Sequence, residues 1–322
     1  MPVPPRTWQQ VLSVSRFFNG KDWNGDGDPD DGISLHLKVG GQGFFHFMSL
    51  SAPFAITPAP GDDPTVVTKH HNIYWFDPDD MTAVINSPGH VRALEFLQEL
   101  AATGSQSQFG WELGEAWDNF LNDNAVLLFS WGDVGSLAQD PNASTIQGKL
   151  GGAPIPCSEV WYDLELGTFV EDSENPNCVS NLVGASWHGV ISKNSDVQDL
   201  AYYFLAMQAQ PDILFWNVTY GWTGVDPSST THLFPPAGEA SVDDYVAAGY
   251  NAADVESYIT AYGQNLFDFP ISQTYLRIPG TPEYWNILDI RLAQAHDRRA
   301  VAAGCDGLGR GGMGTDHRRY WA

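Results

Sequence analysis

The stretch Ala116-Trp-Asp-Asn-Phe-Leu-Asn-Asp-Asn-Ala-Val-Leu-Leu-Phe-Ser-Trp-Gly132 runs from a predicted helix through a strand into a turn. Residues 116–122 have the pattern of a short helix, and the apolar run 125–129 is typical of a buried strand that ends at a Trp-Gly turn. The same succession recurs along the chain, with an alternating strand at residues 33–39 and a helix from residue 88 to Gly104. Helices and strands that alternate in this way predict an α/β fold.

Capping residues mark where other helices begin. Thr7 stands three residues before Gln10, which is a capping box ahead of an amphipathic run. Ser87-Pro88 supplies an N-cap followed by proline at the first helical position. Ser195 or Asp196 is expected to cap a helix that has Leu200, Phe204, Leu205 and Met207 on one side, and residues 183–191 predict a further strand. We find no internal repeat or linker, so two lobes in a chain of this length would be interleaved.

The chain is strongly acidic. Fifteen Lys and Arg residues against 39 Asp and Glu residues give a formal net charge of −24. Such a charge repels phosphate backbones and anionic membrane surfaces, which excludes nucleic acid as a partner. The 12 Trp, 12 Tyr and 17 Phe residues serve either as core filler or as flat stacking surfaces. No apolar run is long enough to span a membrane, and residues 1–5 lack the features of a signal peptide.

The three cysteines are Cys157, Cys178 and Cys305, with no Cys-x-x-Cys pair to favour a thiolate metal site. Cys157 and Cys178 flank a stretch that is typical of strand, turn and strand. In an oxidising compartment a disulfide would close this span. The alternative is two free, buried thiols.

Common catalytic motifs are missing. The sequence has no GxxxxGK[ST], HExxH or GxSxG motif. In the stretch Gly184-Ala-Ser-Trp-His-Gly189 the second glycine stands one position too late for a nucleophile elbow. Because the chain has so many acidic residues, a carboxylate pair at glycosidase spacing carries no weight by itself. The sequence therefore predicts a protein that is not an enzyme.

An acidic loop between the first helix and the first strand resembles a calcium-binding loop. Its oxygen-bearing side chains fall at alternating positions, with a glycine at position 6, as in an EF-hand. Position 12, where a bidentate glutamate normally stands, is Ile33. The loop is thus either a structural calcium site or a solvated acidic turn. The candidate ligands are Asp22, Asn24, Asp26, Asp28 and Asp30.

Six segments, taken in order, resemble the family 1 extracellular solute-binding proteins of bacterial ABC sugar importers, which are similar to maltose-binding protein. The resemblance extends from about Pro5 to about Ala295. The segments are Pro5-Arg-Thr-Trp8, the Asn-Gly-Asp-Gly loop at 24–27, Ser87-Pro-Gly-His-Val-Arg-Ala-Leu-Glu95, residues 116–125, Ser130-Trp-Gly-Asp-Val-Gly135 and Gly184-Ala-Ser-Trp-His-Gly-Val-Ile-Ser-Lys-Asn-Ser195.

The resemblance implies a type II periplasmic-binding-protein fold, in which two interleaved lobes enclose the ligand. It also implies a monomeric periplasmic receptor without cofactor that delivers a sugar or sugar-like solute to ABC permease subunits in the inner membrane. The alternative is a secreted carbohydrate-active hydrolase, which would need two carboxylates converging in the cleft.

The resemblance also predicts how the lobes are divided. The segment at Thr7-Trp8 corresponds to an early part of the second lobe, so we expect the first lobe to be incomplete here and a signal peptide to precede it. Residues 1–150 and 227–295 are assigned to the second lobe. Residues 151–226 are assigned to the segment that returns to the first lobe.

The ligand-binding side chains implied by the resemblance are aromatic rings that stack on a sugar and polar groups that bond its hydroxyls. The aromatic candidates are Phe45, Trp131, Tyr284 and Trp285 in the second lobe, with Trp187 and Trp222 from the returning segment. The polar candidates are Gln42, His46, Asp133 and His188. For each ring the alternative is an ordinary core position.

The composition changes abruptly at His296. Five of the ten arginines follow Ala295, among glycines and Cys305. Read one base later, suitable synonymous codons for residues 296–322 give the Gly-x-x-Ser-Pro-x-x-Ala ending and helix of the family. We therefore interpret this tail as the product of a frameshift near Ala295, and expect it to be disordered.

Overall fold

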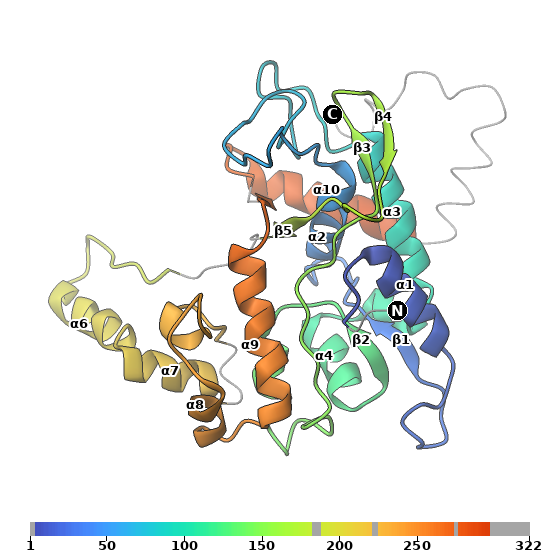
Figure 1. The fold of residues 1–322 in the computed structure, drawn as a ribbon. Coiled ribbons are helices and arrows are strands. Elements are labelled where there is room, and N and C mark those ends of the chain that lie inside the picture. Colours follow the sequence, from blue (N-terminus) through green and yellow to red (C-terminus); the bar gives the residue numbers. More distant parts are fainter. Residues whose placement is uncertain (1–3, 182–187, 221–224, 274–275, 297–322) are drawn as a thin grey trace.

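The computed structural model describes residues 4–181, 188–220, 225–273 and 276–296, and helices and strands alternate along much of this part of the chain (Figure 1). The helices are α1 (Trp8–Phe18), α2 (Phe44–Ala55), α3 (Pro88–Ala101), η1 (Gln106–Gly110), α4 (Leu113–Leu121), α5 (Asp133–Leu137), α6 (Gln198–Gln208), α7 (Pro211–Thr219), η2 (Thr230–His232), α8 (Val242–Ala247), α9 (Ala252–Phe267) and α10 (Thr281–His296). The strands are β1 (Asp31–Ser34), β2 (Ala125–Leu128), β3 (Val160–Asp163), β4 (Thr168–Glu171), β5 (Val179–Asn181) and β6 (Ile271–Gln273).

The main core lies around α2, which is apolar on nearly every side and buried from His46 to Ala55. A helix without a polar face is stable only inside a protein, and here α3, α10 and the strands β3 and β5 pack around it. Gly89 lets α3 approach α2 closely, because a Cβ there would lie 2.5 Å from the Phe54 carbonyl oxygen. The core thus fixes the first turn of α2, which carries Phe45.

Parallel pairing joins segments that are far apart in the sequence. β1 pairs with β2 so that Ile33 lies opposite Leu127, and β5 pairs with β6 so that Val179 lies opposite Ile271. Parallel neighbours need a crossover connection, which α2, α3 and α4 supply between β1 and β2. The mixed, interleaved α/β architecture agrees with the fold class predicted from the sequence.

A second core surrounds α9 and is rich in tyrosine. Tyr245, Tyr250 and Tyr258 are buried there with Val255 and Ile259. This core packs beside the turn that follows β2, and it supplies contacts used below. Among the described residues no helix is both long and apolar enough to cross a membrane.

The predicted capping of the first helix is confirmed with one difference. Thr7 Oγ1 accepts a hydrogen bond from the Gln10 amide at 3.3 Å. The Gln10 side chain accepts from the Arg6 amide at 2.9 Å, one residue before the partner that a capping box would use. The helix at residue 88 is also confirmed, although Val91 is 49% exposed because Ala93 and Phe96 take the buried face.

Two element boundaries differ from the prediction. The strand predicted over residues 33–39 ends at Ser34, and Val39 is exposed. The helix expected after Ser195 has Val197 at its N-cap, while Ser195 Oγ accepts from the Val197 amide at 3.2 Å. Of the strand predicted at 183–191, residues 183–187 lie outside the described part, and residues 188–191 form no strand.

The α6–α7 pair stands away from the main core (Figure 1). The apolar side predicted for α6 exists, but no residue of that helix is buried, and Leu200 is 68% exposed. Earlier parts of the 151–226 segment behave differently, since Ile155, Val160 and Val179 pack on the main core. The proposed lobe boundaries stay a prediction, as does the frameshifted tail, of which residues 297–322 lie outside the described residues.

The structure joins Cys157 to Cys178 in a disulfide, which confirms the first of the two alternatives for these cysteines. Between them β3 and β4 form the expected antiparallel hairpin. Asn177 anchors the C-terminal end of this segment, because its side-chain amide donates to the carbonyls of Pro53 and Ile56 at the end of α2. The crosslink therefore ties the base of the hairpin beside the main core.

Candidate functional site

Three of the predicted aromatic positions meet in space although they are far apart in the sequence. Phe45 on α2 lies edge-on to Trp131, with ring centroids 5.1 Å apart. Trp285 on α10 lies 6.2 Å from Phe45 on the centroid-to-centroid measure. All three rings are only partly buried. The fold therefore gathers a cluster of partly exposed aromatic surfaces from α2, the turn after β2, and α10.

The strand pairing explains why Trp131 lies at this place. β1 and β2 run parallel, so the chain leaves both of them at the same edge of the sheet. Ligand sites of open α/β sheets form at this edge, beyond the carboxyl ends of the strands. His36 follows β1 and Trp131 follows β2, and their rings stack with centroids 5.4 Å apart and planes 19° apart. The backside of Trp131 is thus supported by a buried imidazole.

His46 was predicted as a polar ligand contact, and the structure corrects this. The side chain is 3% exposed, and its Nε2 accepts the backbone amide of His36 at 3.3 Å. Burial, together with the neighbouring His36, holds the pKa of His46 well below its usual value, so the ring is neutral. A neutral ring is required for Nε2 to accept. His46 supports the loop beneath the aromatic cluster and does not form its surface.

Asp133 stands two residues after Trp131, beyond Gly132, and begins α5. Its carboxyl is partly buried, and burial followed by the charge of Asp226 raises its pKa to about 7. Burial also raises the pKa of Asp226, whose carboxylate accepts a hydrogen bond from the Tyr262 hydroxyl. Near neutral pH Asp133 can therefore either accept or donate a hydrogen bond.

The remaining predicted residues lie at the margin of the cluster or outside the described part of the chain. Gln42 is exposed in a left-handed turn with φ of 69°, just before α2. Tyr284 is 39% exposed and packs against Phe76, while His188 is exposed on the segment that leads to α6. Trp187 and Trp222 lie outside the described residues.

Two rings of the cluster were missed from the sequence. Phe44 stacks on Phe45 at 4.3 Å and reaches Trp285 at 5.6 Å, on the centroid-to-centroid measure. The Phe-Phe pair itself was the available signal. His36 was missed because it stands between Leu35 and Leu37 in a strand pattern that places alternate residues on the outer face.

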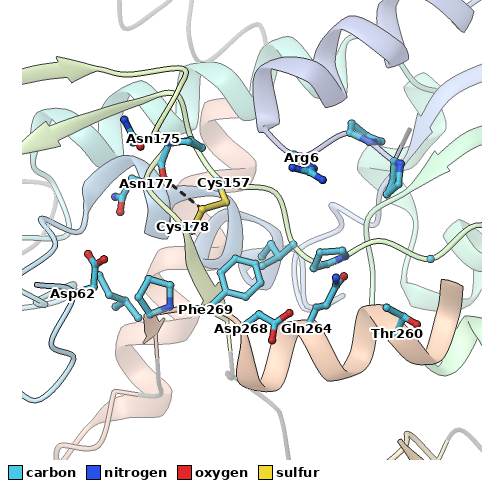
Figure 2. A pocket seen from close by; sticks show the side chains of 18 of the residues that line it. Arg6, Asp62, Cys157, Asn175, Asn177, Cys178, Thr260, Gln264, Asp268 and Phe269 are labelled. Carbon is cyan, nitrogen blue, oxygen red and sulfur yellow. Dashed lines mark hydrogen bonds between the residues drawn. A yellow bond between two sulfur atoms is a disulfide. The ribbon is translucent and has the colours of Figure 1, made fainter. Parts of the chain in front are cut away.

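A large cavity elsewhere in the molecule is built from other residues. It has a volume of about 880 Å³ and lies between α9 and the disulfide (Figure 2). Its polar walls include Arg6, Asp62, Gln264 and Asp268, and Phe269 contributes an aromatic face. None of the ligand-binding residues predicted from the sequence lines it. The aromatic cluster and this cavity are therefore separate features of the surface.

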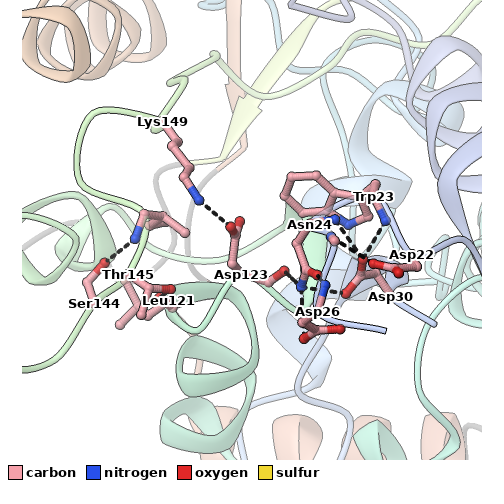
Figure 3. A network of polar contacts seen from close by, with 12 residues as sticks. Asp22, Trp23, Asn24, Asp26, Asp30, Leu121, Asp123, Ser144, Thr145 and Lys149 are labelled. Carbon is pink, nitrogen blue, oxygen red and sulfur yellow. Dashed lines mark hydrogen bonds and ion pairs between the residues drawn. The ribbon is translucent and has the colours of Figure 1, made fainter. Parts of the chain in front are cut away.

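The acidic loop is closed by its own hydrogen bonds (Figure 3). Backbone amides donate to Asp22, Asn24 and Asp26 within the loop, and the amides of Trp23 and Asn24 donate to Asp30 Oδ2 at 2.9 and 3.3 Å. The side-chain amide of Asn24 donates to the carbonyl of Asp123, which ties the loop to the segment before β2.

The hydrogen bonds of the loop engage the oxygens that were predicted to bind calcium. Within the described ranges no group of three or more His, Cys, Asp and Glu side chains is gathered closely enough to hold a metal ion by itself. Asp28 is exposed, and its backbone amide donates to the Asp26 side chain. The side-chain amide of Asn24 donates to the carboxylates of Asp26 and Asp30. These bonds match the acidic-turn alternative, and calcium binding stays a prediction.

Solved structures with a similar fold are known. No family model and no curated protein sequence matches the chain. Among solved structures it is similar to maltose-bound MalE3 of T. maritima, with TM-score 0.57 and 16% identity over 95% of this chain and 66% of that one. It is equally similar to an ABC transporter solute-binding protein of Agrobacterium radiobacter K84 in complex with ribitol, with TM-score 0.56 and 16% identity over 94% and 65%.

A third similar structure is an ABC transporter solute-binding protein of Agrobacterium vitis S4 with bound D-mannitol. Its TM-score is 0.51 at 13% identity, over 95% of this chain and 66% of that one. The chain therefore has the type II fold of solute-binding proteins, and it spans just under two thirds of the length of these structures.

Proposed function

We propose that this chain is part of the extracytoplasmic substrate-binding component of an ABC importer. It binds a sugar or sugar-like solute without chemical change and delivers it to the permease subunits in the inner membrane. A periplasmic location fits the disulfide, because such bonds persist in oxidising compartments. The acidic charge of −24 excludes nucleic acid as the ligand. We propose that the receptor acts as a monomer.

The observation that carries the proposal is the meeting of Phe45, Trp131 and Trp285 at the carboxyl edge of a parallel sheet. The apolar face of a pyranose or polyol packs on flat rings, while nearby polar groups bond its hydroxyls. Asp133 and Gln42 are the polar groups best placed along the chain for this role. We assign Trp131 as the central stacking surface because the buried His36 ring fixes it from behind.

The hydrolase alternative has less support. Hydrolysis of a glycosidic bond needs two carboxyl groups on either side of the scissile bond. Asp133 and Asp226 are neighbours with raised pKa values, but Asp226 is bonded to Tyr262 on α9. A carboxylate held in this way is turned toward the helix. We expect no release of reducing sugar from maltooligosaccharides or xylooligosaccharides.

Isothermal titration with maltose, D-mannitol and ribitol tests the proposal. We expect at least one of these probes to bind, and Trp131→Ala to weaken it about tenfold or more through the lost stacking surface. Trp216→Ala is the matched control, because Trp216 is 55% exposed on α7, where its ring stacks on Tyr220 away from the aromatic cluster. Equal affinity of Trp131→Ala and wild type would refute the site, and hydrolysis of a probe would refute the receptor.

A further inference from the structure

The turn that carries Trp131 rests directly on two tyrosines of α9. A Cβ on Gly132 would lie 1.8 Å from the Tyr262 hydroxyl oxygen, so only glycine fits there. The Tyr258 hydroxyl donates to the Gly132 carbonyl at 2.9 Å, and its ring fills the space beside Gly135. The two tyrosines are one helical turn apart and their rings meet edge to face at 5.3 Å. The position of this turn is therefore set by α9.

Tyr262 also contacts the segment that follows α7. The Tyr262 hydroxyl donates to Asp226 Oδ1, so one oxygen atom contacts both Gly132 and Asp226. A second tie lies close by, where Ser136 of α5 and Tyr250 both donate to the Val218 carbonyl at 3.0 and 3.1 Å. Both ties connect α5 and its preceding turn to the segment that bears α6 and α7.

Among the described residues, the titratable groups that interact with Asp133 are Asp226 on the returning chain and Tyr262 on α9. Tyr258 and Tyr250 interact with these groups in turn. In the part of the chain that the structure describes, no basic side chain contributes to the pKa of Asp133. The described part of this environment consists of two carboxyls and buried phenols.

We propose that Tyr262 and Asp226 are positioning residues of the candidate site: together they fix where Trp131 and Asp133 stand and tie that placement to the chain returning from α7. The role of these residues in ligand binding rests on the proposed function, whereas the contacts that fix Trp131 do not. Loss of the Tyr262 hydroxyl releases Asp226 and opens a gap against Gly132. The Trp131 ring then moves relative to His36.

Fluorine NMR on 5-fluorotryptophan protein tests the placement without any ligand. The Trp131 resonance is assigned with Trp131→Phe and followed from pH 5 to pH 9. We expect Tyr262→Phe to shift this resonance, and Asp226→Asn to move its titration midpoint from near 7, the pKa of Asp133, to lower pH. Removal of the neighbouring negative charge favours the ionised form of Asp133, which sets this direction.

Tyr245→Phe is the matched control. Tyr245 is also buried in the second core, and its hydroxyl donates to the His232 carbonyl at 2.7 Å, away from the turn. Its loss is expected to lower the melting temperature and leave the Trp131 resonance in place. A Trp131 resonance and midpoint that are identical in wild type and Tyr262→Phe would overturn the inference.

A binding arm separates this inference from the proposed function. For a probe that binds wild type, we expect Tyr262→Phe to weaken it about fivefold or more, in keeping with the loss of one hydrogen bond, and Tyr245→Phe to leave the affinity unchanged. Unchanged affinity in Tyr262→Phe would refute the positioning role for binding. If no probe binds wild type, the proposed function fails, while the NMR result still decides the placement.

Discussion

Acid should destabilise the chain through His36, whose side chain is fully buried. Its Nδ1 donates to the Gly41 carbonyl at 3.0 Å, and its ring lies between those of His46 and Trp131. Burial lowers the pKa of His36 to about 4, from 6.5 in the unfolded chain. Because the folded pKa is depressed, the unfolded state takes up the proton first as the pH falls.

The size of the effect follows from linkage. His36 contributes nothing to the pH dependence well above 6.5, and the loss of stability grows from pH 6.5 down to about pH 4. At pH 5 the unfolded pKa lies about 1.5 units higher, and at about 1.36 kcal/mol per unit this gives a loss of about 2 kcal/mol. Asp133 acts in the opposite direction, since its raised folded pKa of about 7 makes protonation stabilising as pH falls. The total pH dependence is therefore a difference, and a variant must isolate His36.

Urea unfolding of wild type and His36→Gln at pH 7.5 and pH 5 makes this measurement. Glutamine keeps a donor for the Gly41 carbonyl and does not titrate. The variant should be less stable than wild type at pH 7.5, because the packing of the imidazole ring is lost. Between pH 7.5 and pH 5 the variant should lose about 2 kcal/mol less of its free energy of unfolding than wild type does. His188→Gln, at an exposed histidine, is the control. The same pH dependence in His36→Gln and wild type would refute the reasoning.

Three further outcomes are expected. Gly89→Ala should destabilise by about 1–3 kcal/mol because its Cβ meets the backbone of α2, whereas Gly114→Ala, in open space on α4, should stabilise by about 0.5–1 kcal/mol; equal effects on the urea midpoint would contradict this contact. Replacing Cys157 and Cys178 together by serine should cost about 3 kcal/mol through the freed loop, and thiol titration of the denatured wild type should find one reactive thiol before reduction and three after. Calcium added to EDTA-treated protein should leave the melting temperature unchanged, because hydrogen bonds already close the loop; a clear rise, lost in Asp30→Asn, would show that calcium replaces them.

Local pattern was sufficient where a segment decides its own structure. The apolar run after residue 124 and the helix before it are present as β2 and α4. Thr7 caps α1 because the cap needs only residues within one turn. The family resemblance led to Phe45, Trp131 and Trp285, which the fold then brings together. Their role in binding stays a prediction.

The misses have a common physical cause. Alternation assumes that a strand has one solvent-exposed face, but β1 ends at Ser34, and His36 beyond it is as buried as Leu35 because it packs between His46 and Trp131. Tyr258 and Tyr262 share a face of α9 by their spacing, yet nothing in that spacing says that Gly132 lies against it. For α6 the pattern correctly predicted an apolar side, but periodicity does not tell what covers such a side.

The isolation of α6 has a thermodynamic consequence. Its helix contacts α7 and buries none of its residues, whereas α3 is packed into the main core. Short helices without tertiary packing are marginal in water. Amide hydrogens of α6 should therefore exchange with solvent by local opening, while those of α3 wait for global unfolding. The α6 helix should therefore contribute little to the cooperative unfolding transition, which reports mainly on the packed cores.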